Sequence, residues 1–139
     1  MPTSTPIRRI DLQHGTITER IIGQFYNVYD ALGHGFLEST YEEAMVIALR
    51  ADGLRVDRQV PITVYFRGRA IGTYEADLIV ESCVVVELIA SRAIDSAHEA
   101  QLINLLRATG LEVGLLMNFG RRPAFKRLVF ANDRKPATG

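Results

Sequence analysis

The feature that most limits the fold of this chain is a strand–helix–strand unit in its second half. Residues 84–89 read Val-Val-Val-Glu-Leu-Ile, a β-branched run typical of a strand buried on both faces. A helix is predicted over residues 97–108 with Asp95 or Ser96 as its N-cap, and residues 113–118 predict a second buried strand. Two such strands joined by one helix are expected to lie parallel in one sheet, with a right-handed crossover.

A hairpin is predicted just before this unit. Ile62, Val64 and Phe66 alternate with polar residues, which is the pattern of a half-buried strand. Residues 67–69 read Arg-Gly-Arg and predict a tight turn into a second strand over residues 70–80. A last strand is expected over residues 125–130, after a turn at Arg122-Pro123.

The first third of the chain predicts two helices. Apolar residues recur at helical spacing over residues 17–32, and a second helix is expected to stop at Asp52-Gly53. Thr16 with Glu19, and Ser39 with Glu42, have the form of capping boxes at the two helix starts. The resulting order ααβββαββ predicts an α/β fold with a mixed sheet flanked by helices. We expect one domain over residues 16–131, between a flexible arm (1–15) and a flexible tail (132–139).

Composition limits the function more weakly than the fold. A length of 139 residues suits one domain, and a formal net charge of zero removes the simplest argument for a nucleic-acid-binding protein. Residues 119–139 nevertheless carry six basic residues against a single acid, Asp133, which suits either a solubilising tail or contact with a polyanion. Cys83 is the one cysteine, so a cysteine-based zinc site is excluded. We expect a cytoplasmic protein, because no stretch approaches the length of a membrane span.

Two acids stand out inside predicted strands. Asp77 lies in the second strand of the hairpin, and Glu87 lies in the most apolar strand of the chain. Ionised carboxylates in such places are costly unless they are paired, hydrogen-bonded or bound to a metal. If the two strands are neighbours, the carboxylates converge and offer a site for Mg²⁺ or Mn²⁺. Alternatively, each acid faces solvent at a strand end or pairs with an arginine.

Several motifs along the chain resemble one protein family. Residues 35–41 read Gly-Phe-Leu-Glu-Ser-Thr-Tyr and match the pattern that names the bacterial GxxExxY protein family. The strand with Asp77, the Val-Val-Val-Glu-Leu segment, His-Glu-Ala-Gln-Leu at 98–102 and Gly-Leu-Leu-Met-Asn-Phe-Gly at 114–120 look like that family, in its order. The resemblance covers roughly residues 17–130. That family is grouped with the PD-(D/E)xK nuclease superfamily, which implies a metal-binding acidic site.

The resemblance also implies roles for individual residues. Asp77 would be the first metal-binding acid, Glu87 the acid of the (D/E)xK motif, Glu38 the acid contributed by a helix, and Gln101 the polar helix residue that lines such sites. From the residues alone, Glu38 is equally explained by the helix macrodipole, and Gln101 by a solvated helix face.

One departure from the family pattern bears on catalysis. The (D/E)xK motif has a lysine two residues after its acid, and here that position is Ile89. Such a lysine orients the attacking water and stabilises charge on the phosphate, which isoleucine cannot do. Arg92 could reach back to supply a positive charge. We also expect Arg92, Lys126 and Arg127 to contact nucleic acid.

Three functions remain open at the level of sequence. The first is a metal-dependent phosphodiester hydrolase acting on DNA or RNA, with catalysis impaired or lost because the motif lysine is missing. The second is a non-catalytic module that binds nucleic acid or a nucleotide. The third is a structural, partner-binding homodimer, with residues 114–119 and the first helix as candidate interface.

Overall fold

The computed structural model describes residues 14–135, and its elements follow the order expected from the sequence. The two N-terminal helices are α2 (Gly15–Leu32) and α3 (Glu38–Ala51). The remaining elements are β1 (Val56–Phe66), β2 (Arg69–Val80), β3 (Val84–Ile89), α4 (Ser96–Arg107), β4 (Val113–Asn118), β5 (Ala124–Val129) and a 3-10 helix (Asn132–Arg134). Within residues 14–135, no helix has the length and apolar character of a membrane span.

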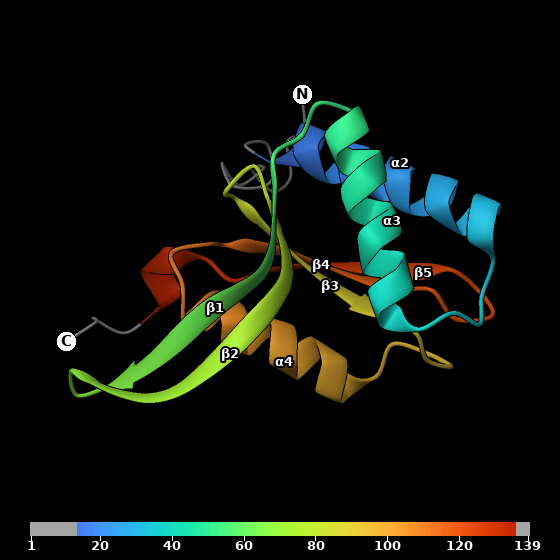
Figure 1. The fold of residues 1–139 in the computed structure, drawn as a ribbon. Helices are drawn as coiled ribbons and strands as arrows, with labels where there is room; N and C mark the ends of the chain where they lie inside the picture. The colour runs from blue at the N-terminus through green and yellow to red at the C-terminus, as the bar shows by residue number, and fades with distance from the viewer. Residues whose placement is uncertain (1–13, 136–139) are drawn as a thin grey trace, which may run out of the picture.

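The sheet has five strands in the spatial order β1-β2-β3-β4-β5. Strands β3 and β4 are parallel, and the other neighbours are antiparallel, so the sheet is mixed. Figure 1 shows α2 and α3 on one face of the sheet and α4 on the other. The expected parallel crossover is confirmed, and the fold class is the mixed α/β arrangement that the order of elements predicts.

A separate apolar core fills each side of the sheet. On the side of α2 and α3, Phe25 and Tyr41 pack against Phe119 and the buried strands. On the side of α4, Leu102 and Leu105 pack against residues that include Val85, Ile89 and Leu116. Every residue of β3 and β4 is buried, so these two strands form the rigid centre of the molecule. In particular, β4 leaves no free surface for the partner interface that the sequence suggested.

The β1–β2 hairpin separates from the rest of the sheet part-way along its length. Strand β2 pairs with β3 only from Leu78 to Val80, whereas it pairs with β1 along the whole hairpin. Ala76 and Leu78 are two residues apart on β2, so in a regular strand their side chains would share one face of the sheet. They pack instead into opposite cores, which shows that the hairpin rotates sharply between them. Gln59, which opposes this segment, has a φ of 46°. The divergence leaves an opening beside the end of β3.

The helix starts differ in part from the sequence expectation. Helix α2 begins at Gly15 after His14, and α3 begins at Glu38 after Leu37, and neither N-cap side chain accepts a hydrogen bond. Both predicted capping boxes are therefore wrong. At α4 the N-cap is Asp95, whose side chain accepts a hydrogen bond from the amide of His98 at 3.0 Å. Of the two expected N-caps, Asp95 and Ser96, the first is therefore confirmed.

The two ends of the chain lie largely outside the described residues. The expected flexible arm falls there except for residues 14 and 15, and so do residues 136–139 of the expected tail. The part of the tail that is described contacts the domain. Lys135 donates from Nζ to the carbonyl oxygens of Thr109 at 2.9 Å and Leu111 at 2.8 Å.

Candidate functional site

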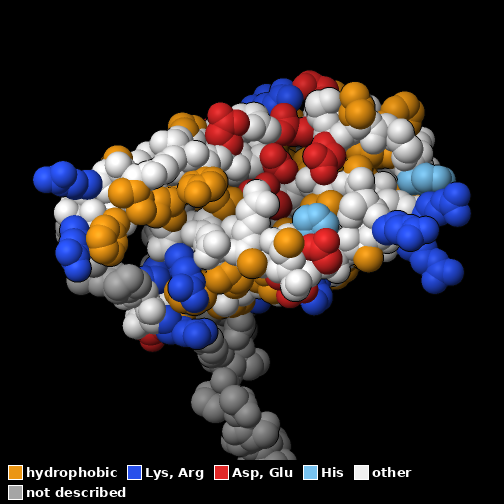
Figure 2. All heavy atoms as spheres, turned by 90° about the horizontal axis from the view of Figure 1, so that it is seen from below, with side chains coloured by type: hydrophobic (Ala, Val, Ile, Leu, Met, Phe, Trp, Pro, Cys, Tyr) orange, Lys and Arg blue, Asp and Glu red, His pale blue; other side chains and the backbone are white. Residues whose placement is uncertain are grey.

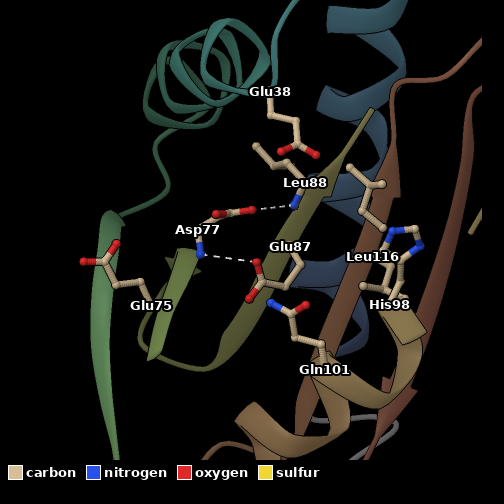
Figure 3. A pocket seen from close by; sticks show the side chains of 9 residues that line it. Glu38, Glu75, Asp77, Glu87, Leu88, His98, Gln101 and Leu116 are labelled. Carbon is tan, nitrogen blue, oxygen red and sulfur yellow. Dashed lines mark hydrogen bonds between the residues drawn. The ribbon is translucent and has the colours of Figure 1, made fainter. Parts of the chain in front are cut away.

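Asp77 and Glu87 lie opposite each other where β2 separates from β3. The paired residues Leu78 and Val86 end the ladder, and one further step in the same register brings the two acids together. The Asp77 amide donates to Glu87 Oε2 at 3.4 Å, and the Leu88 amide donates to Asp77 Oδ2 at 2.8 Å (Figure 3). Each carboxylate thus accepts a hydrogen bond from a backbone amide of the facing strand, just beyond the end of the ladder. The expectation that the two strands are neighbours is correct.

A small pocket of about 200 Å³ opens over these two acids. Four elements contribute acids or amides to it: β2 carries Asp77, β3 carries Glu87, α3 carries Glu38, and α4 carries Gln101. In Figure 3 the Gln101 side chain points toward Glu87, and Glu38 approaches from the opposite side. The four residues named from the sequence therefore line one cavity, although they come from elements far apart in the chain.

The pocket is electrostatically unfavourable for its own carboxylates. Glu87 is only 8% exposed, and its Oε1 atom accepts no hydrogen bond from the residues that the structure describes. Burial, followed by the negative charge of Asp77, raises the pKa of Glu87 from 4.5 to about 9. The Glu87 carboxyl therefore holds a proton at neutral pH unless a cation replaces it. A buried carboxyl oxygen without a partner is a place where a ligand can bind.

The donor atoms suit a hard divalent cation, but the protein supplies few of them. Across residues 14–135, no group of three or more His, Cys, Asp or Glu side chains is arranged to hold a metal ion. Asp77 and Glu87 are thus paired, while Glu38 and Glu75 line the pocket without joining them in a three-ligand group. Mg²⁺ is commonly held by one or two carboxylates, with waters and substrate phosphates completing its shell. The donor chemistry of the pair is therefore compatible with Mg²⁺ or Mn²⁺, with the remaining ligands coming from outside the protein.

Ile89, two residues after Glu87 on β3, lies on the pocket wall. Ile89 is 6% exposed. It belongs to the apolar core beneath α4, which also contains Leu105. Glu87 and Ile89 are two residues apart on β3, so their side chains project to the same face of the sheet. The pocket wall next to Glu87 is therefore apolar at the position where a cation would be useful.

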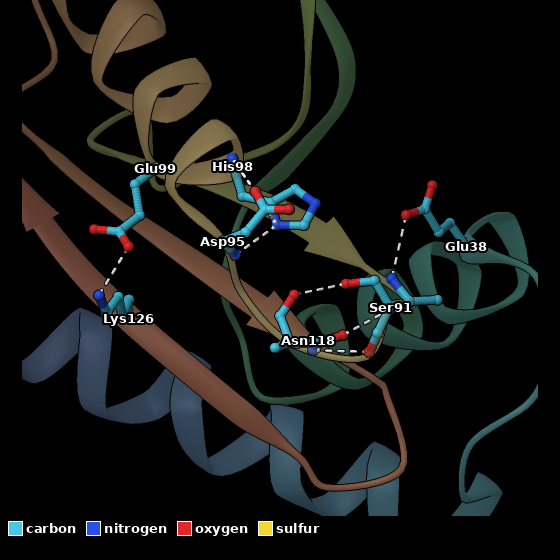
Figure 4. A network of polar contacts seen from close by, with 9 residues as sticks. Glu38, Ser91, Asp95, His98, Glu99, Asn118 and Lys126 are labelled. Atoms are coloured by element: carbon cyan, nitrogen blue, oxygen red, sulfur yellow. Dashed lines mark hydrogen bonds and ion pairs between the residues drawn. The ribbon is translucent and has the colours of Figure 1, made fainter.

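Glu38 lies at the start of a helix and also lines the acidic pocket. It is the first residue of α3, and its Oε2 atom accepts a hydrogen bond from the amide of Ala90 at 3.2 Å. Ala90 directly follows β3, so this bond ties the start of α3 to the chain leaving the acidic pocket (Figure 4). The two explanations for Glu38 are compatible, because the same carboxylate lies at the helix start and lines the pocket.

Four further residues at this site were not identified from the sequence. Glu75 and His98 line the pocket, while Glu42 and Gln59 line a shallower hollow beside Asp77. Glu42, interpreted from the sequence as a capping residue, is instead 9% exposed and accepts from Arg58 at 3.0 Å. Its position on the buried side of α3, four residues after Glu38, was a signal that could have been used.

The expected cations lie outside the acidic pocket. Lys126 on β5 donates to Glu99 of α4 at 2.8 Å (Figure 4), and Arg127 beside it is half-buried. Arg92 is exposed in the loop after β3 and lines a different hollow. None of the three is among the residues that line the acidic pocket. Figure 2 shows the carboxylates gathered near the middle of one face, with cationic side chains toward its ends.

Comparisons with known proteins agree with this architecture. The family model of the PD-(D/E)XK nuclease superfamily matches residues 15–128. Among solved structures, the crystal structure of SSO0001 is similar, with a TM-score of 0.54 and 18% sequence identity. The similarity covers 88% of this chain and 62% of that one, so this chain spans less than two thirds of SSO0001, and the likeness shows the fold alone. No curated protein matches the sequence. Because the family model spans most of its length, the chain belongs to the PD-(D/E)XK nuclease superfamily.

Proposed function

We propose that this protein binds a divalent metal at Asp77 and Glu87 and acts on the phosphodiester backbone of DNA or RNA, with hydrolysis slowed or lost. One observation carries the proposal. Two facing carboxylates lie in a pocket, one of them buried with an unpartnered oxygen and with a pKa raised to about 9. A folded domain keeps such an arrangement at a cost in stability, which a bound cation would offset.

The finer family assignment supports reduced catalysis. The Gly35–Tyr41 heptad resembles the bacterial GxxExxY proteins, and that resemblance implies that Ile89, two residues after Glu87, stands in the place of the motif lysine. When bound, Mg²⁺ or Mn²⁺ would polarise a phosphoryl oxygen and lower the pKa of a bound water. Asp77 and Glu87 would hold the ion, and Gln101 and Glu38 would orient groups around it. Ile89 leaves the charge that grows on the phosphate without a neighbouring cation.

Nucleic-acid contact is proposed for three cationic residues. Arg92 is placed best, because it lies in the loop that leaves the acidic pocket. Lys126 and Arg127 lie on β5, and Lys126 is already paired with Glu99. We expect Arg92 to contribute most to binding of the three.

The first test is calorimetric titration of Mn²⁺ into the parent protein, Asp77→Asn and Glu87→Gln. We expect one site in the parent and at least about a 100-fold weaker site in each variant, because each removes a charged ligand. Glu75→Gln is the matched control: it removes an exposed acid from the same pocket and should leave affinity within about threefold. Absence of Mn²⁺ binding by the parent would overturn the metal site.

The hydrolytic part of the proposal has its own variant. Ile89→Lys restores an ammonium group beside Glu87, and the flexible lysine stem can follow the apolar wall toward the pocket. We expect Mn²⁺-dependent cleavage of single-stranded or duplex oligonucleotides at least about tenfold above the parent. Ile89→Met, which keeps the wall apolar, is the control. Equal activity in the parent, Met and Lys proteins would contradict the idea that this residue limits hydrolysis.

A partner-binding role is the second candidate. The far half of the β1–β2 hairpin exposes Tyr65, Phe66, Ile71 and Tyr74, each more than half exposed. Exposed apolar side chains gathered on one hairpin are commonly contact sites for other proteins. A homodimer formed there should be visible as a doubled mass in light scattering. A monomer at all concentrations, together with Mn²⁺ binding, would favour the metal-dependent proposal.

A further inference from the structure

A second hollow lies immediately beside the acidic pocket and has the opposite charge. It is lined by three loops: residues 34–36 between α2 and α3, residues 90–92 after β3, and residues 119–122 between β4 and β5. Its volume of about 660 Å³ is larger than that of the acidic pocket. We refer to it as the basic groove, because its lining includes His34, Arg92, Arg121 and Arg122 and no acid.

Two tyrosine side chains, the half-buried Tyr29 and the buried Tyr41, hold the groove in place. The Tyr29 hydroxyl lies 2.8 Å from the carbonyl oxygen of Gly120 and 2.7 Å from that of Arg121. The Tyr41 hydroxyl donates to the carbonyl oxygen of Gly33 at 2.6 Å and accepts from the amide of Phe36 at 3.2 Å. These contacts fix two of the three loops to helices that are anchored in the core. The groove is therefore formed before any ligand binds.

The loop after β3 is in turn fixed directly to the loop after β4. Asn118 is 1% exposed, and its side chain exchanges hydrogen bonds of 3.0 Å with the amide and the carbonyl of Ser91 (Figure 4). Gly120 lies so close to this loop that a Cβ atom there would stand 2.1 Å from the Ser91 carbonyl oxygen. The close approach requires glycine and keeps Arg92 near Arg121 and Arg122 on the rim of one groove.

The cations of the groove are available to a ligand. Within residues 14–135, no carboxylate forms an ion pair with Arg92, Arg121 or Arg122, and all three are exposed. Guanidinium groups bind phosphate through paired hydrogen bonds. Phe36 is 49% exposed at the edge of the groove, and an exposed ring beside arginines can stack on a base. A phosphate-bearing, partly aromatic ligand matches this combination.

The groove and the acidic pocket share a wall. Ile89 lines the pocket and Ala90 lines the groove, while Phe36 lines the groove and Glu38 lines the pocket. The hydrogen bond from the Ala90 amide to Glu38 joins these two chain segments at the boundary. A polymer with regularly spaced phosphates can therefore occupy both hollows at once, which a single free phosphate cannot do.

We propose that the basic groove binds the phosphodiester backbone of the nucleic-acid strand whose reacting phosphate lies at Asp77 and Glu87. This inference rests on the proposed function, because the acidic pocket identifies the strand. It adds the path of the strand and assigns Arg121 and Arg122 as its phosphate contacts, with Arg92 at the wall and Phe36 as the base-stacking surface.

The test is fluorescence anisotropy with a short labelled single strand and with its duplex, in buffer containing Ca²⁺. Arg121→Ala/Arg122→Ala should bind about 10- to 100-fold more weakly than the parent, and the salt dependence of single-strand binding should fall by about 1.4 in logarithmic slope. The matched control is Arg67→Ala/Arg69→Ala, which removes two exposed arginines of the hairpin outside the groove. It should weaken binding by less than about threefold.

The outcomes separate this inference from the proposed function. Loss of oligonucleotide binding in the groove variant, with Mn²⁺ affinity unchanged by calorimetry, supports the groove. The same loss in a protein that binds no Mn²⁺ keeps the groove and overturns the metal site. An equal loss in both double variants shows general charge attraction and overturns the groove. Undetectable binding of both oligonucleotides by the parent overturns it as well.

Discussion

The two hollows at the end of β3 are neighbours, yet they are built in opposite ways. The acidic pocket places charge inside the sheet, where burial raises the pKa of Glu87 to about 9. The basic groove places charge on exposed loops and buries the neutral groups that hold those loops, Asn118 and the ring of Tyr41. The first arrangement costs stability until a ligand arrives, whereas the second stabilises the fold at all times.

The largest expected effect on stability tests whether the loops of the basic groove are held rigidly. Gly120→Ala places a methyl group against the Ser91 backbone, so we expect the free energy of unfolding to fall by about 2–3 kcal/mol. Gly110→Ala is the control, because a Cβ atom there meets nothing within 4 Å, and it should change stability by less than about 0.5 kcal/mol. Urea unfolding measures both. Equal stability of the two variants would show that the loops separate easily and that the groove is not preformed.

A smaller change in the free energy of unfolding, this time an increase, tests the acidic pocket. Because the folded pKa of Glu87 is raised, the folded state keeps a proton that the unfolded state releases, and stability falls as pH rises from about 4.5 to about 9. Glu87→Gln removes this loss. We expect the metal-free variant to be about 1–2 kcal/mol more stable than the parent at pH 8 and nearly equal to it at pH 4.5.

The measurement is urea unfolding in EDTA at the two pH values. Glu75→Gln, an exposed acid on the same pocket, should show no such pH-dependent gain. A Glu87→Gln protein that is less stable than the parent at pH 8 would mean that the ionised carboxylate is satisfied in the fold. The contrast between the two hollows would then lose its physical basis.

The smallest effect concerns a cation that belongs to neither hollow. Lys126 is half exposed and pairs with Glu99, so Lys126→Ala should change the free energy of unfolding by less than about 0.5 kcal/mol. Because Glu99 already neutralises this charge, we also expect oligonucleotide affinity to fall by less than about threefold. Anisotropy that showed a loss as large as that of Arg121→Ala/Arg122→Ala would mean that the proposed Lys126 contact on β5 contributes as much as the groove.

Much of the fold could be predicted because its central strands are short, continuous runs of apolar residues. Continuous hydrophobicity identifies β3 and β4 as buried strands. The single helix between them predicts the parallel crossover that the structure has. The proximity of Asp77 and Glu87 followed from that framework. What periodicity could not give is the rotation of the hairpin between Ala76 and Leu78, because both residues are apolar and only packing decides which core each one joins.

The errors at the site have a common physical cause. Ser39 and Glu42 fit a capping box, but tertiary contacts with Arg58 and Gln59 recruit Glu42 to a different role. The basic groove was not identified because its arginines come from loops separated by about thirty residues in the sequence, and each by itself looks like ordinary solvated surface. Charge that converges only after folding is invisible to spacing rules.

The shared wall also has a thermodynamic consequence. The Gly35–Tyr41 heptad contributes Phe36 to one hollow and Glu38 to the other, and Tyr41 clamps both to the core by stacking on Phe119 at 4.2 Å. Under the proposed function, a ligand that shifted the Glu38–Ala90 bond in one hollow would change the affinity of the other. Linkage would make that coupling reciprocal, so a strand that tightened metal binding would itself be bound more tightly, by the same factor, in the presence of metal.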